Sequence, residues 1–114
     1  MKLFAFILLM IVPFNSLADC MQASNGQVFC GLGYCDVSNS GIVSCSIFRK
    51  GGAAVNGQGR VNCGKGLCLQ NNAGQVLCSI QEEGGAAINI SGQVKCFGGC
   101  EPGSESMCES IRGE

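Results

Sequence analysis

The sequence predicts an all-β protein made of tandem short β-hairpins, arranged in a 33-residue repeat and stapled by disulfides. The motif Gly-x-Val-x-Cys occurs five times, and residues 30–63 are followed by a second copy of the same plan at residues 63–96. The 114 residues include ten cysteines and eighteen glycines, a composition typical of disulfide scaffolds. The five motifs end at Cys30, Cys45, Cys63, Cys78 and Cys96.

The first eighteen residues have the pattern of a secretory signal peptide. Lys2 supplies a positive charge, residues 3–12 are apolar, and Ala18 is a small residue suited to cleavage. An apolar run of this length is shorter than the roughly 20 residues of a membrane helix. We therefore expect a mature chain without a membrane span, secreted or periplasmic after cleavage near Ala18. The expected organisation is a signal peptide at 1–18, a cysteine-rich hairpin repeat domain at 19–100 and a polar C-terminal tail at 101–114 tied by Cys108.

The charge balance excludes some classes of partner. The chain has seven Lys and Arg against eight Asp and Glu, and loss of Lys2 with the signal peptide leaves six against eight, a net charge of −2. Nucleic acids and anionic membrane surfaces both require clustered basic residues, so neither is expected as a partner. The expected partner is an extracellular or envelope protein or a glycan.

Each Gly-x-Val-x-Cys motif is interpreted as the second arm of a hairpin. The motif Gly is the third residue of a three-residue turn, a position that commonly requires a left-handed backbone. Because strand side chains alternate between two faces, Val and Cys are predicted to share one buried face, while Ser44, Ser46 and Ser79 fall on the opposite, polar face. The predicted hairpins span residues 20–30, 35–45, 53–63, 68–78 and 86–96.

The hairpin register suggests a disulfide pattern. Three hairpins place two cysteines opposite each other, which favours Cys20–Cys30, Cys35–Cys45 and Cys68–Cys78. The other two hairpins place Ala53 opposite Cys63 and Ala86 opposite Cys96, so the expected remaining pairs are Cys63–Cys96 and Cys100–Cys108. Spacing alone does not fix connectivity. The alternative closes the short loops Cys30–Cys35, Cys63–Cys68 and Cys96–Cys100, with Cys20, Cys45, Cys78 and Cys108 pairing among themselves.

The sequence shows no catalytic constellation. It contains no His, which removes Ser-His-Asp and Cys-His arrangements, and its close cysteines lack the Cys-x-x-Cys spacing of zinc and thioredoxin-like sites. We therefore expect no catalytic residue, no cofactor and no metal site. A thiol-redox or metal-binding protein remains the weaker alternative.

Two long connectors differ mainly in charge. They read SIFRKGG at 46–52 and SIQEEGG at 79–85, and they occupy equivalent places in the repeat. One interpretation is that both connectors are solvated surface loops. The functional interpretation is that their opposite charges help two repeat units or two molecules to dock. The candidate interaction residues are Phe48, Arg49, Lys50, Gln81, Glu82 and Glu83. Asn89-Ile90-Ser91 also has the pattern of an N-glycosylation acceptor, which has meaning only in a eukaryotic source.

The repeated strings GQVFCGLGYC, GRVNCGKGLC, CSIFRKGGAA and CSIQEEGGAA resemble a loosely defined group of small bacterial exported cysteine-rich proteins with tandem Gly-x-Val-x-Cys repeats. The resemblance covers nearly all of the chain after residue 18. It implies export and repeat architecture and supplies no site residue. The expected function is a small exported structural or binding protein without catalysis, and the first alternative is a secreted toxin, inhibitor or effector-like binder acting through its loops.

Overall fold

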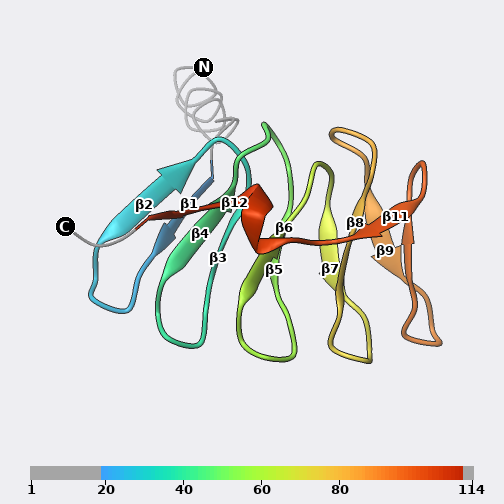
Figure 1. Cartoon of the computed structure of the whole chain (residues 1–114), viewed down its shortest axis with the longest axis horizontal. Coiled ribbons are helices and arrows are strands. Elements are labelled where there is room, and N and C mark those ends of the chain that lie inside the picture. The colour runs from blue at the N-terminus through green and yellow to red at the C-terminus, as the bar shows by residue number, and fades with distance from the viewer. Residues whose placement is uncertain (1–18, 112–114) are drawn as a thin grey trace, which may run out of the picture.

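The fold is all-β. A computed structural model describes residues 19–111, which contain no α-helix and form five antiparallel hairpins side by side in chain order (Figure 1). The predicted fold class is therefore confirmed. The expected signal peptide at 1–18 lies outside the described residues. The hairpins pair β1 (Asp19–Gln22) with β2 (Val28–Gly31), β3 (Cys35–Val37) with β4 (Val43–Ser46), β5 (Ala53–Val55) with β6 (Val61–Cys63), β7 (Cys68–Gln70) with β8 (Val76–Ser79), and β9 (Ala86–Ile88) with β10 (Val94–Cys96).

The hairpin turns have the predicted geometry. In the second hairpin, for example, Gly41 N donates to Ser38 O at 2.9 Å and Ser38 N donates to Ile42 O at 2.9 Å, which closes a three-residue turn. The five motif glycines have φ between 81° and 91°, a region that side chains disfavour. The turn glycines are Gly26, Gly41, Gly59, Gly74 and Gly92.

Neighbouring hairpins are tied together at their tips. The first turn residue of one hairpin donates its N–H to the glycine carbonyl of the next turn, and this bond recurs at all four junctions between the described hairpins. The ladder aligns the hairpins in register along the stack. Its bonds are Ser24 to Gly41 at 3.3 Å, Asn39 to Gly59 at 2.9 Å, Gly57 to Gly74 at 2.8 Å and Asn72 to Gly92 at 3.2 Å.

At the connector end of the stack, the hydrogen bonds recur with the 33-residue period. Tyr34 N donates to Gly51 O at 2.8 Å, and Leu67 N donates to Gly84 O at the same distance. Ser46 Oγ donates to Gly64 O at 2.9 Å, and the equivalent Ser79 Oγ donates to Phe97 O at 2.6 Å. These bonds explain why Ser46 and Ser79 are fully buried.

The core lies between hairpins because each Val-Cys face is covered by the other face of the preceding hairpin. Met21, Ala23 and Phe29 pack on the cluster formed by Cys35, Val43 and Cys45. Two predictions about burial are wrong. Ser44, Ser46 and Ser79 are buried, because stacking buries both faces of inner hairpins. Val28 is 63% exposed, because no described hairpin precedes the first one.

The C-terminal segment is not a plain polar tail. Residues 100–111, called the strap from here on, run back across the second arms of the hairpins (Figure 1). Strand β11 (Cys100–Pro102) pairs with β8, and β12 (Cys108–Ile111) pairs with β4. Between them, the short 3₁₀ turn η2 (Glu105–Met107) follows Ser104, which exchanges two 3.0 Å backbone bonds with Cys63. The strap thus joins three hairpins that the ladder joins only pairwise.

The chain turns back at Phe97 for a steric reason. Phe97 stands where the two preceding repeats have Gly31 and Gly64. A Cβ on Gly31 would collide with Cys45, and one on Gly64 would collide with Cys78. A sixth hairpin stacked in the same way would place its disulfide against Phe97. Gly98 and Gly99, both at positive φ, instead redirect the chain into β11.

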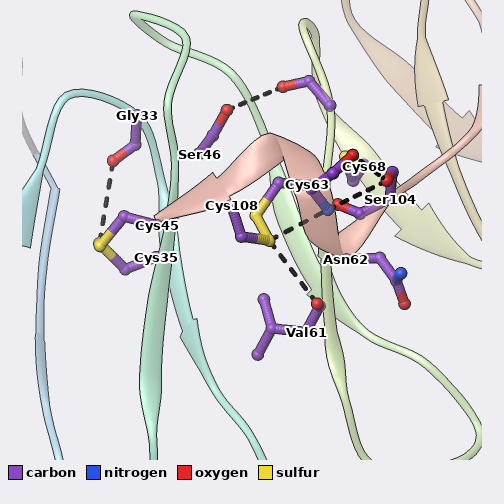
Figure 2. The surroundings of a disulfide bond; sticks show 12 residues. Gly33, Cys35, Cys45, Ser46, Val61, Asn62, Cys63, Cys68, Ser104 and Cys108 are labelled. Carbon is purple, nitrogen blue, oxygen red and sulfur yellow. Dashed lines mark hydrogen bonds between the residues drawn. A yellow bond between two sulfur atoms is a disulfide. The ribbon is translucent and has the colours of Figure 1, made fainter. Parts of the chain in front are cut away.

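Five disulfides join all ten cysteines within residues 19–111. Cys20–Cys30, Cys35–Cys45 and Cys68–Cys78 are the cross-strand pairs that the register predicts. The expected pairs Cys63–Cys96 and Cys100–Cys108 are wrong. Cys63 is bonded to Cys108 (Figure 2), and Cys96 is bonded to Cys100. The strap explains the difference, because it carries Cys108 along β6 to Cys63, and Cys96–Cys100 is the one short-loop bridge of the alternative scheme that forms.

Candidate binding surfaces

The two long connectors lie next to each other on the connector edge, which we define as the five connectors at residues 31–34, 47–52, 64–67, 80–85 and 97–99. Lys50 Nζ lies 3.8 Å from Glu83 Oε1, with both side chains about half exposed. The opposite charges noted in the sequence therefore meet within one chain. Lys65 Nζ lies 6.0 Å from the centre of the Phe48 ring, which links a tight connector to the first long one. Arg49, Gln81 and Glu82 are exposed.

The long connectors are held in a defined shape. In the first, Phe48 N donates to Ser46 Oγ at 3.2 Å and Gly51 N donates to Phe48 O at 2.9 Å. The second repeats both bonds with Gln81, Ser79 and Gly84. Lys50 and Glu83 have φ of 60° and 62°, so both loops accept the same uncommon backbone conformation at the residue that carries the paired charge.

Exposed apolar side chains gather on the connector edge. Tyr34 and Leu67, with Lys50, Glu83, Gly84 and Gly85, line a shallow groove of about 260 Å³. Aromatic, aliphatic and basic side chains in one place are typical of protein-binding surfaces, and single exposed apolar residues are ordinary. The large apolar residues exposed on this edge are Leu32, Tyr34, Ile47, Ile80 and Phe97, between 45% and 69%.

The opposite, tip edge carries two grooves lined mainly by polar residues and glycines. One groove of about 340 Å³ lies between the second and third hairpins and includes the Arg60–Glu105 ion pair at 3.4 Å. A second groove of about 500 Å³ lies between the third and fourth hairpins and is bounded on one side by Pro102 and Gly103 of the strap. The sequence analysis missed both grooves. Their only sequence signal is the variation of the first turn residue among Ser24, Asn39, Gly57, Asn72 and Ile90.

Asn89, in the glycosylation pattern, has a structural role at its turn. Its Oδ1 accepts from Ser91 N and Gln93 N, both at 3.0 Å. Asn71 forms the same bonds one hairpin earlier, at 2.9 Å to Ala73 N and 2.9 Å to Gln75 N. Such side-chain bonds stabilise turns, so the Asn at this position is explained without a modification.

The described residues contain no group of three or more His, Cys, Asp or Glu that could hold a metal ion. Every cysteine among them is in a disulfide. Within residues 19–111, no helix has the length and apolar character needed to cross a membrane.

The fold and these surfaces define a disulfide-stapled repeat protein made of stacked β-hairpins. No protein-family model, curated protein or solved structure matches the chain.

Proposed function

We propose that this chain is an exported, non-catalytic scaffold that binds an extracellular or envelope protein through its connector edge. The observation that carries the proposal is the meeting of the two long connectors at Lys50 and Glu83. Beside this pair lies the exposed Tyr34, in the same groove, and Ile80 is exposed on the same edge.

The rigidity of the connectors supports a binding role. The buried hydroxyl groups of Ser46 and Ser79 hold both long loops to the neighbouring tight connectors. A preformed surface loses little conformational freedom on association, which favours affinity. The five disulfides support export, because disulfides in a small domain are typical of oxidising compartments.

An enzymatic or thiol-redox role has weaker support. The sequence lacks His, and disulfide-bonded cysteines offer no thiolate for nucleophilic or redox chemistry. A secreted toxin or inhibitor would use the same connector edge, so it differs from an envelope component in the identity of the partner and not in the surface used.

The connector edge is testable by site-specific photo-crosslinking in the cells that produce the protein. A photoreactive amino acid is placed at Tyr34 or Ile80 on the connector edge. Matched control positions are Val28 and Ile90, which are equally or more exposed but lie away from the connectors. We expect discrete protein adducts from Tyr34 and Ile80 only.

A charge exchange provides the second arm of the test. The double variant Lys50→Glu/Glu83→Lys keeps an ion pair but reverses its direction, so the fold is retained while the surface charge pattern changes. Yield of the Tyr34 adduct should fall in this variant. Adducts formed from Val28 or Ile90 as readily as from Tyr34 would contradict the proposal.

A further inference from the structure

The larger tip groove lies at the junction where the first turn residue has no side chain. At the other junctions, the first turn residue covers the glycine of the next turn: Asn39 lies over Gly59, and Asn72 lies over Gly92. At the junction of the third and fourth hairpins this residue is Gly57, whose Cα faces Gly74. No side chain fills the space there, and the groove of about 500 Å³ remains.

The walls of the groove carry amide groups with unused hydrogen-bonding capacity. Asn62 Oδ1 accepts from Asn56 Nδ2 at 2.7 Å, which leaves Asn62 Nδ2 unpaired among the described residues. Gln75 Oε1 accepts from Asn71 Nδ2 at 3.4 Å, which leaves Gln75 Nε2 unpaired in the same part of the chain. The Gln58 amide forms no side-chain hydrogen bond within residues 19–111.

No charged residue lines this groove. Its amide walls adjoin the ring of Pro102 and the methyl group of Ala73, both exposed. This differs from the 340 Å³ groove, where the Arg60–Glu105 ion pair lies in the wall. A ligand of the larger groove therefore needs several hydroxyl or carbonyl groups, some apolar surface and no net charge.

We propose that the groove between the third and fourth hairpins is a binding subsite for a neutral sugar unit of an oligosaccharide. Hydroxyl oxygens accept from the free amides of Gln58, Asn62 and Gln75, and the C–H face of the ring lies against Pro102 and Ala73. The groove volume falls within the range of small-molecule sites, about 300 to 1,000 Å³. This proposal is independent of the protein partner proposed for the connector edge.

The test is a titration of the ¹⁵N-labelled full-length mature protein, followed through the side-chain NH₂ signals of Gln58, Asn62 and Gln75. The probes are the neutral tetrasaccharides of glucose (α-1,4 and β-1,4), mannose and N-acetylglucosamine, with tetragalacturonate as the charged comparison. We expect saturable shifts of these three amides with at least one neutral probe. A dissociation constant on the order of 1 mM is expected for so few contacts.

Two variants and a matched control locate the site. Gly57→Asn restores the side chain found at the equivalent position of the second and fourth hairpins, and it should abolish the saturable shifts by filling the groove. Gln75→Ala should weaken binding about five-fold, the loss expected for one net hydrogen bond. Gln93→Ala removes the equivalent amide of the fifth hairpin, which accepts in the same way from Asn89 but lies outside the proposed groove, and it should leave binding unchanged.

The outcomes are decisive in both directions. The backbone amide signals of the first and fifth hairpins report whether each variant is folded. If Gly57→Asn is unfolded, the comparison of Gln75→Ala with Gln93→Ala decides the test. Absence of saturable shifts with all four neutral probes up to about fifty times the expected dissociation constant would overturn the proposal. So would equal weakening by Gln75→Ala and Gln93→Ala, or tighter binding of tetragalacturonate.

Discussion

Cys63 of β6 is joined to Cys108 of β12 across 45 residues, whereas Cys96 and Cys100 are joined across four. The first bridge fixes the strap to the middle of the hairpin stack, and the second closes only the turn that precedes the strap. The two bonds are chemically alike but constrain very different amounts of unfolded chain.

The long bridge should therefore stabilise the fold more than the short one. In the chain-entropy treatment, the Cys63–Cys108 loop contributes about 4 kcal/mol and the Cys96–Cys100 loop about 2 kcal/mol. We expect the double variant Cys63→Ala/Cys108→Ala to lower the free energy of unfolding more than Cys96→Ala/Cys100→Ala, as measured by urea denaturation. Equal losses would show that the strap is held by its strand pairing and not by its disulfide.

The tight connectors should reject any side chain at one glycine of each repeat. A Cβ on Gly64 would collide with the Cβ of Cys78, and overpacking of this kind costs about 1–3 kcal/mol. We expect Gly64→Ala to lower the free energy of unfolding by that amount. Gly85→Ala is the control, since an added Cβ there meets nothing within 4 Å, and thermal unfolding of both variants makes the comparison.

Replacing Lys50 with glycine should not destabilise the fold, despite the loss of the ion pair. The pair with Glu83 is exposed and contributes little, at most about 1 kcal/mol. Its backbone, at φ of 60°, costs a non-glycine residue about 1–2 kcal/mol. We expect Lys50→Gly to be neutral or to raise the free energy of unfolding by up to about 1 kcal/mol, whereas Lys50→Val, with a branched side chain, should lower it. A marked loss in Lys50→Gly would mean that the ion pair matters more than the backbone.

The buried serines should contribute equally in both repeats. Ser79 Oγ accepts from Gln81 N at 3.1 Å and donates to Phe97 O at 2.6 Å, so Ser79→Ala removes two partly buried hydrogen bonds, at a cost of about 1–3 kcal/mol. Ser46→Ala should cost a similar amount, because its bonds are equivalent. Ser91→Ala, at an exposed tip, is the control. Denaturant midpoints of the three variants check the ranking.

The local features of the fold were predictable because they depend on short-range rules. The spacing of Gly59 and Cys63 within one motif fixes a turn and a strand arm, and the opposition of Cys35 and Cys45 fixes a bridge. It was harder to predict which faces of the strands are buried. The alternation of strand residues predicts that Ser46 faces solvent, but the next hairpin covers it. The same alternation predicts that Val28 lies in the core, but no described hairpin covers it.

The strap was beyond the reach of these rules. Its strands pair with partners that are distant in sequence, and residues 101–111 do not repeat the motif that identified the hairpins. One signal was available. Phe97 replaces a glycine that both earlier repeats retain, which marks the point where stacking stops and the chain must go elsewhere. The tip groove has an equally small signal, the single glycine at position 57.

The path of the strap sets an order on maturation. The three cross-strand bridges each close over ten residues and require only local chain, so each can form as soon as its own hairpin is present. Cys63 has to wait longer, because its partner lies 45 residues further along the chain. Until Cys108 arrives, the growing chain carries a reactive thiol at the centre of an otherwise closed molecule. A chain that ends before Cys108 keeps that thiol, which is then open to disulfide exchange.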